Sequence, residues 1–160
     1  MGLEILEDAP DTVAIIAAIG GGGLITGVAS AVKALRPEIR VWGAEPATAA
    51  PAALSFAKGS AQVFPDWKAT FVDGAGGKSV FPRMWQRMQP LVDGYIVVSL
   101  DEVKRAMRLM AEKARVIAEG AGALGLAAAL TGKAGSGPIV AIVSGGNIDL
   151  EKFSELIAAG

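Results

Sequence analysis

Four consecutive glycines, Gly20 to Gly23, are the residues of this sequence whose type and spacing point most clearly to chemistry. They follow an apolar run, residues 13–19, and precede a segment with helical spacing, residues 24–35. Glycine has no side chain to keep a ligand from the backbone, and it lets successive N–H groups point into one concavity. The following helix adds the positive end of its dipole, so we expect an anion, and specifically a phosphate, at this turn. A flexible, tightly packed turn without a ligand is the alternative interpretation.

A second glycine-containing turn, Ser144-Gly145-Gly146-Asn147, follows another apolar run, residues 139–143. Ligands of parallel sheets bind outside the carboxyl ends of the strands. If both apolar runs are parallel strands, the two turns lie at the same edge of the sheet. The sequence therefore predicts that both turns serve one shared ligand.

The elements that must position these turns alternate between strands and helices along the chain. Short, continuously apolar runs are typical of strands that are covered on both faces. This alternation predicts an α/β fold, a doubly wound, mainly parallel sheet with helices on both faces, in a single domain of residues 1–160. We expect strands at 13–19, 39–44, 95–98 and 139–143, helices at 2–9, 24–35, 48–58, 79–88, 99–116, 120–130 and 150–159, and a long loop at 59–78.

Composition excludes several classes of function. The chain contains no cysteine and no histidine, which rules out disulfides, Cys/His zinc sites and Ser-His-Asp triads. With 15 basic and 16 acidic residues it lacks the basic excess of a nucleic-acid-binding surface. No stretch reaches the ~18 apolar residues of a membrane span, the first residues lack the basic segment of a secretion signal, and we expect a cytoplasmic location. A hydrophobic fraction of 52% and a mean hydropathy of +0.45 indicate an apolar surface meant for a partner.

Two nucleotide-binding interpretations compete for the glycines. Gly21 to Gly23 with Gly27 match a loosened dinucleotide fingerprint, and Glu45 at the end of the second expected strand could accept a ribose hydroxyl, although Thr26 stands where the strict motif needs glycine. Gly77-Lys78-Ser79 matches the end of a nucleotide P-loop, but Val72 occupies the position of its leading glycine. Neither motif is complete.

Several short motifs in one order resemble the threonine/serine dehydratases, which belong with serine racemase to the fold type II enzymes dependent on pyridoxal phosphate. The motifs are Gly2 to Glu7, Gly20 to Gly23 with Leu24-Ile25-Thr26-Gly27, Ala44-Glu45-Pro46, Val72-Asp73-Gly74, Val92-Asp93-Gly94, Glu119 to Ala123 and Ser144 to Asp149. The resemblance covers nearly the whole chain, but only about the second half of the family's sequence. It implies the cofactor-facing C-terminal part of an enzyme that carries out α,β-elimination on a hydroxy amino acid, its small-molecule substrate, to give a 2-oxo acid and ammonia.

The resemblance also implies roles for individual residues. Gly20, Gly21, Gly22 and Gly23, with Leu24, match the loop that holds the phosphate of the cofactor. Ser144 matches the hydroxyl that hydrogen-bonds the pyridine nitrogen, and Gly145 follows it. A neutral serine does not hold that nitrogen protonated, which favours β-elimination over chemistry that needs a long-lived carbanion. Gly74 matches a loop glycine beside the cofactor, and Glu119 matches a nearby acid or, alternatively, is a charge stabilised by a helix N-terminus.

Two departures from the family pattern limit this expectation. The lysine that forms the Schiff base lies ahead of the tetraglycine loop in the family, and none of the 19 residues before Gly20 is a lysine. In some members an acid matching Glu45 and another six residues later hold a divalent cation, but that second position is Pro51 here, so we expect no metal site. We therefore expect the chain alone to be inactive, and to self-associate or pair with an N-terminal half. A non-catalytic module that binds a phosphate-bearing ligand, or serves in assembly, is the alternative.

Overall fold

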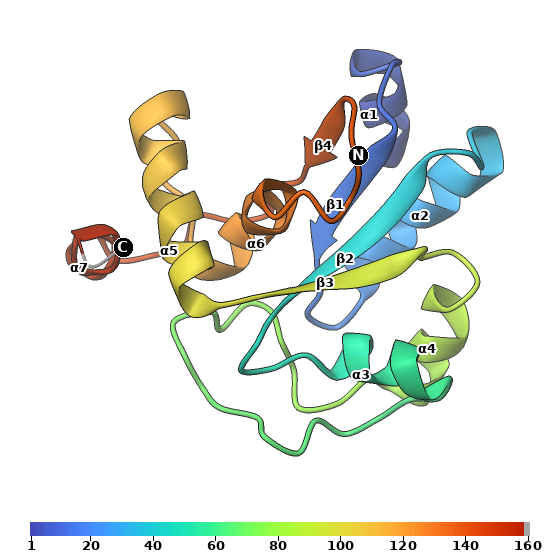
Figure 1. The fold of residues 1–160 in the computed structure, drawn as a ribbon, viewed down its shortest axis with the longest axis horizontal. Coiled ribbons are helices and arrows are strands. Elements are labelled where there is room, and N and C mark those ends of the chain that lie inside the picture. The colour runs from blue at the N-terminus through green and yellow to red at the C-terminus, as the bar shows by residue number, and fades with distance from the viewer. Residues whose placement is uncertain (159–160) are drawn as a thin grey trace.

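The computed structural model describes residues 1–158, in which four parallel strands form a single sheet (Figure 1). The strands are β1 (Ala14–Ala18), β2 (Arg40–Pro46), β3 (Gly94–Val98) and β4 (Ile139–Ala141), in the spatial order β3-β2-β1-β4. β1 pairs in parallel with both β2 and β4, so the carboxyl ends of these three strands lie at one edge of the sheet. The two glycine turns that follow β1 and β4 are therefore neighbours, as the sequence predicts.

Helices cover both faces of this sheet and confirm the predicted doubly wound α/β fold. They are α1 (Gly2–Asp8), α2 (Gly23–Leu35), α3 (Pro51–Lys58), α4 (Pro82–Met88), α5 (Leu100–Leu109), the π-helical turn η1 (Met110–Ala114), α6 (Gly120–Leu130) and α7 (Leu150–Ala158). Side chains of β1 alternate between two cores: Ile15 packs with α1 to α4, and Ile16 packs with α5 to α7. Every residue of β1 is buried, because both of its faces are covered.

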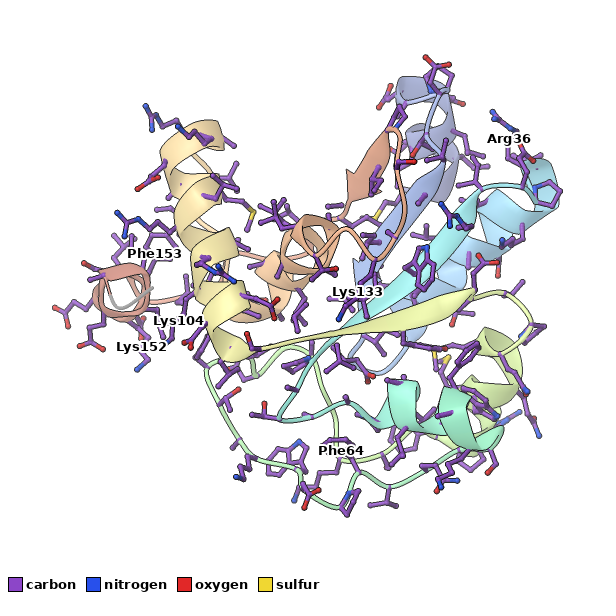
Figure 2. The ribbon with its side chains drawn as sticks, viewed as in Figure 1. Arg36, Phe64, Lys104, Lys133, Lys152 and Phe153 are labelled. Carbon is purple, nitrogen blue, oxygen red and sulfur yellow. The ribbon has the colours of Figure 1, made fainter. Side chains whose placement is uncertain are left out.

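The C-terminal helix is anchored on the second of these cores. Phe153 and Leu156 are buried, and Phe153 lies between α7 and α5 (Figure 2). Burying an apolar side chain of this size contributes about 1.5–3 kcal/mol. The irregular segment of residues 142–149 is thus held at one end by β4 and at the other by α7, and it carries the turn at Ser144.

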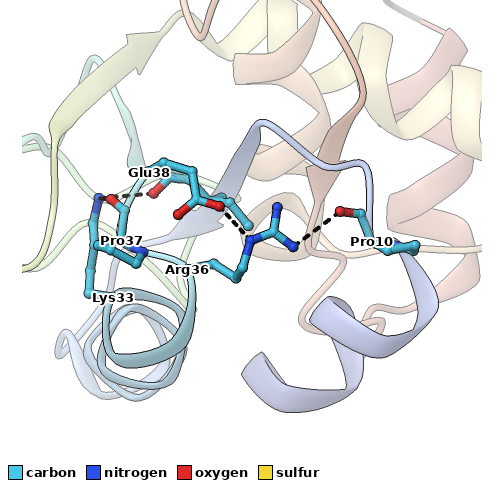
Figure 3. Close-up of polar contacts among 6 residues, drawn as sticks. Pro10, Lys33, Arg36, Pro37 and Glu38 are labelled. Atoms are coloured by element: carbon cyan, nitrogen blue, oxygen red, sulfur yellow. Dashed lines mark hydrogen bonds and ion pairs between the residues drawn. The ribbon is translucent and has the colours of Figure 1, made fainter.

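Polar contacts fix the far end of α2. The side chain of Arg36 contacts Glu38 and donates a hydrogen bond of 3.4 Å to the carbonyl of Pro10 (Figure 3). Lys33 pairs with the half-buried carboxylate of Asp93, 2.8 Å away, at the start of β3. The exposed Arg36–Glu38 pair contributes little stability. Together, however, these contacts tie the C-terminus of α2 to the edge of the sheet that lies opposite the glycine turns.

Some predicted boundaries are wrong, and the structure gives a cause for each error. The second strand continues through Glu45 and Pro46, which pair with β3. Its pairing with β1 stops at Ala44, so the missing N–H of Pro46 removes no bond on that side. Residues 79–81 are not helical, because Ser79 forms an antiparallel bridge with Val63 and α4 begins at Pro82.

Three further differences concern helix and strand lengths. The predicted helix 99–116 is divided into α5 and η1 and ends where Arg115 adopts a left-handed φ of 60°. The predicted strand 139–143 contains only three strand residues, and the third predicted helix begins at Pro51 rather than at 48. The predicted last helix reaches residue 159, which lies outside the described residues.

Candidate functional site

The turn between β1 and α2 presents free backbone donors. Gly22 precedes the first residue of α2 and has a left-handed φ of 84°. Its carbonyl oxygen accepts hydrogen bonds from the N–H of Thr26 at 3.1 Å and from the Thr26 hydroxyl at 2.6 Å. The first N–H groups of a helix have no acceptor within the helix, and the helix dipole makes this end positive. Helix N-termini of this kind are common anion-binding sites in proteins.

Protein packing requires glycine at only two of the four positions. A Cβ atom at Gly20 would lie 2.9 Å from the carbonyl oxygen of Gly74, and one at Gly22 would lie 2.7 Å from Cγ of Met84. A Cβ atom at Gly21 or Gly23 would meet no heavy atom within 4 Å, and neither residue has a left-handed φ. The space above these two glycines is open, and a ligand that enters it reaches the backbone directly.

This open space belongs to a cavity of about 260 Å³. Its wall contains every predicted site residue except Gly145, together with two alanines: Gly20, Gly21, Gly22, Gly23, Leu24, Gly74, Glu119 and Ser144, with Ala18 and Ala121. The predicted residues come from four separate stretches of the chain, and the fold brings them together. We call this cavity the cradle.

Glu119 connects the two sides of the cradle. It precedes the first residue of α6, its N–H donates to the carbonyl of Gly145 at 3.2 Å, and its side chain makes no capping hydrogen bond. A Cβ atom at Gly145 would lie 2.4 Å from Oε1 of Glu119, and one at Gly74 would lie 3.3 Å away. Gly145 thus adjoins the cradle by making room for this carboxylate. Glu119 lies at a helix N-terminus and also in the cavity wall, so its predicted role as an acid beside the cofactor stays a prediction.

Helix α6 approaches the turn after β4 without any intervening side chain. A Cβ atom at Gly122 would lie 2.1 Å from the carbonyl oxygen of Gly145, and one at Gly125 would lie 2.7 Å from that of Ile142. Sequence reasoning did not assign a role to Gly125, or to Ala18 and Ala121 of the cavity wall. For Ala121 and Gly125 the available signal was the series of glycines and alanines at residues 120–123 and 125, which lie along one helix.

Glu45 does not line the cradle, which removes the ribose-binding acid of the dinucleotide interpretation. It is fully buried, and its carboxylate accepts hydrogen bonds from the N–H groups of Ala52 at 3.0 Å and Ala53 at 2.8 Å, at the start of α3. Burial raises the pKa of Glu45 to about 7, and the two hydrogen bonds oppose that rise. Glu45 links β2 to α3.

The P-loop interpretation also lacks its structural context. No strand residue occurs at positions 64–78 ahead of Ser79, which itself forms only an isolated bridge with Val63, and no helix begins at Ser79. The ammonium of Lys78 lies 4.7 Å from the centre of the Trp67 ring. Both residues line a neighbouring cavity of about 450 Å³ that shares Gly20, Gly21 and Gly74 with the cradle.

Neither a metal cluster nor a membrane-spanning helix occurs in the described part of the chain. Within residues 1–158, no three acidic, histidine or cysteine side chains gather closely enough to hold a metal ion. None of the helices in the same range combines the length and apolar character that crossing a membrane demands.

Comparisons with known proteins agree on one family. Residues 1–145 match the family described as "Pyridoxal-phosphate dependent enzyme". The L-threonine ammonia-lyase of Thermotoga maritima is 38% identical over 161 residues, which cover 100% of this chain and 40% of that protein. Among solved structures, a T.th. threonine deaminase is 36% identical with a TM-score of 0.88, covering 93% of this chain and 52% of the other. Maize serine racemase is 39% identical with a TM-score of 0.87, covering 99% and 51%.

The chain spans about 40% of that curated relative and about half of each solved chain. It corresponds to the C-terminal part of its relatives.

Proposed function

The chain belongs to the family of pyridoxal-phosphate-dependent enzymes, and we propose that its cradle holds this cofactor by the phosphate group. The observation that carries the proposal is the open space above Gly21 and Gly23, where nothing in the protein itself requires glycine. A phosphate in that space would accept hydrogen bonds from the backbone N–H groups at the start of α2. The same family membership makes pyridoxal phosphate the cofactor to test first.

The other wall of the cradle supports a position for the cofactor ring. Ser144 is exposed on the segment after β4 and faces the same cavity as the glycine turn. We infer that its hydroxyl hydrogen-bonds the ring nitrogen, that Gly74 leaves room for the flat face of the ring, and that Glu119 and Gly145 border it. A hydroxyl does not carry a full charge, so Ser144 leaves the ring nitrogen unprotonated. When bound, pyridoxal phosphate supplies an electron sink that withdraws electrons from an amino acid substrate.

For the complete protein we propose an ammonia-lyase activity on threonine or serine, which gives a 2-oxo acid and ammonia. The similarity to threonine ammonia-lyase and threonine deaminase supports the choice of reaction. Within the described residues, no lysine lines the cradle. The reactive side chains in its wall are the carboxyl of Glu119 and the hydroxyl of Ser144. Neither group can form a Schiff base with an aldehyde, as the amine of a lysine does. Turnover therefore needs a lysine that these 160 residues do not bring to the cradle, and we propose that the chain alone is inactive.

We further propose that an N-terminal half, or a second copy, covers the β4 side of the sheet. β4 is an edge strand whose three residues are each only partly buried, so one side of its backbone is free to pair. Val143, two residues after β4, has an exposed apolar side chain, and so has Ile117, whose carbonyl oxygen lies beside Gly146. If a second copy covers this edge, sedimentation of the chain should detect self-association. A monomer at all concentrations would contradict the second copy and leave the N-terminal half as the proposed cover.

The decisive experiment separates the phosphate from the rest of the cofactor. Calorimetric titration should compare pyridoxamine phosphate, which has no aldehyde and cannot react with surface lysines, with pyridoxamine, which lacks the phosphate. We expect pyridoxamine phosphate to bind at least about tenfold more tightly, since phosphate contacts at a helix N-terminus are charge-assisted. Equal affinities, or tighter binding of NAD, would contradict the phosphate assignment.

A second measurement tests the expected inactivity. The chain should be treated with pyridoxal phosphate and borohydride, digested and mapped by mass spectrometry, and assayed for 2-oxo acid production from threonine and serine. We expect no lysine to be modified preferentially and no 2-oxo acid to form. A single reducible lysine together with turnover would contradict the proposal. Phosphate-dependent binding without turnover would fit both the C-terminal part of a family enzyme and a non-catalytic module that binds a phosphate-bearing ligand.

A further inference from the structure

The five methionines of the chain differ sharply in exposure. Met88, Met107 and Met110 are buried, with at most 5% of their surface exposed, and Met1 at the N-terminus is 56% exposed. The fifth methionine, Met84 on α4, is partly exposed. Oxidation of a thioether depends on the access of the oxidant to sulfur. Met84 is therefore the most exposed of the internal methionines.

Met84 lies directly behind the glycine turn. A Cβ atom at Gly22 would lie 2.7 Å from its Cγ and 3.3 Å from its sulfur. The hydroxyl of Thr26 is 3.4 Å from this sulfur, and the same hydroxyl donates to the carbonyl of Gly22 at 2.6 Å. The conformation of the turn thus depends on a hydroxyl that two acceptors share, one of which is a weakly accepting thioether.

We propose that Met84 is an oxidation site that changes the shape of the cradle. A peroxide transfers one oxygen to the thioether: an S–O bond forms, the O–O bond breaks, the sulfur loses two electrons, and the peroxide is reduced to water. The sulfoxide oxygen is a much stronger acceptor than the thioether, so it competes with the carbonyl of Gly22 for the Thr26 hydroxyl. It also adds volume beside Gly22, where the space is too narrow even for a Cβ atom, and Gly22 moves away from α4.

The effect on ligand binding follows from this movement and rests on the proposed phosphate site. When Gly22 is displaced, the N–H groups at the start of α2 no longer point toward the proposed position of the phosphate. The loss of one such hydrogen bond weakens binding about fivefold. Because a methionine sulfoxide reductase restores the thioether, the change is reversible.

The test treats the full chain with hydrogen peroxide and follows three quantities. Peptide mass spectrometry measures the sulfoxide fraction at each methionine, amide NMR follows Gly21 to Leu24, and calorimetry measures the affinity for pyridoxamine phosphate. We expect sulfoxide at Met1 and Met84 while Met107 stays reduced, shifted amide resonances at the turn, and about fivefold weaker binding. Treatment with a methionine sulfoxide reductase should reverse all three changes.

Matched variants assign the effect to one sulfur. Met84→Leu keeps the volume and cannot form a sulfoxide, so peroxide should leave its turn resonances unchanged even though Met1 is oxidised. Met84→Gln places an amide oxygen near Thr26 and should shift the same resonances without peroxide. Oxidation of Met84 at the rate of Met107, or a sulfoxide at Met84 with unmoved turn resonances, overturns the proposal. If the untreated chain binds no pyridoxamine phosphate, the proposed function fails, but the NMR comparison still decides whether Met84 controls the turn.

Discussion

Adjacent glycines in the tetraglycine turn should respond in opposite ways to the same substitution. Gly21→Ala adds a methyl group where no protein atom lies within 4 Å, at a residue without a left-handed φ. Gly22→Ala adds the same group at a φ of 84°, with Cγ of Met84 at 2.7 Å and the sulfur of Met88 at 2.8 Å. The first change tests the space for the ligand, and the second tests the packing of the protein.

The magnitudes follow from these two environments. Alanine in place of glycine at a permitted φ stabilises a folded chain by about 0.4–1 kcal/mol, so Gly21→Ala should not lower the melting temperature. A left-handed alanine costs about 1–2 kcal/mol, which lowers the melting temperature of a domain of this size by about 2–8 °C for Gly22→Ala. If a phosphate occupies the space above Gly21, the new methyl group should cost about 1–3 kcal/mol of binding free energy, or about 5- to 150-fold in affinity.

Thermal unfolding and calorimetric titration with pyridoxamine phosphate measure these two effects on the same preparations. Wild-type affinity in Gly21→Ala would refute the idea that the phosphate lies over this glycine. A loss of stability in Gly21→Ala equal to that in Gly22→Ala would mean that packing, and not a ligand, requires glycine at both positions.

Three further predictions concern the elements around the cradle. Gly122→Ala should destabilise the chain by about 1–3 kcal/mol in urea unfolding, because the alanine Cβ would lie 2.1 Å from a backbone oxygen. Gly27→Ala on the open face of α2 is the control and should be neutral or stabilising; equal changes in stability for the two variants would count against the close approach of α6. Burial raises the pKa of Glu45 in the folded chain to about 7 from an ordinary value near 4.5, so folding favours the protonated carboxyl. The stability that this group contributes should therefore be fully present below pH 4.5 and be lost as the pH rises to about 7. The difference in unfolding free energy between wild type and Glu45→Gln should change across that interval, and a constant difference would contradict the raised pKa. Ser99→Ala removes the capping box with Glu102 at the start of α5 and should lower the free energy of unfolding by about 1 kcal/mol, measured by thermal unfolding. An unchanged melting temperature would contradict this prediction.

The cradle was largely predictable because its residues follow strands in the sequence. An apolar run followed by glycines and a helical pattern identifies the turn at Gly20, and parallel pairing then brings Ser144 to the same edge. Gly74 and Glu119 could not be placed in this way. They come from a loop and from a helix start, and only the resemblance to a family assigned them to the site before the structure placed them in the cavity wall.

The failed predictions depend on contacts that are distant in sequence. Proline normally ends a strand, but Pro46 lies beyond the last residue of β2 that pairs with β1, so its missing N–H is tolerated. The dinucleotide interpretation needed Glu45 at an accessible position near a ligand, yet the start of α3 folds back over it and supplies two N–H donors. The sequence pattern contains neither the length of the neighbouring strand nor the path of the following helix.

The glycines of α6 have a consequence for the thermodynamics of binding. Since Gly122 and Gly125 bring the helix against backbone atoms of Gly145 and Ile142, no rotatable side chain lies between the helix and the turn that it supports. The position of the turn is then fixed by backbone geometry before any ligand arrives. A site of this kind is preorganised, so a ligand that enters it orders few additional groups and loses little conformational entropy of the protein.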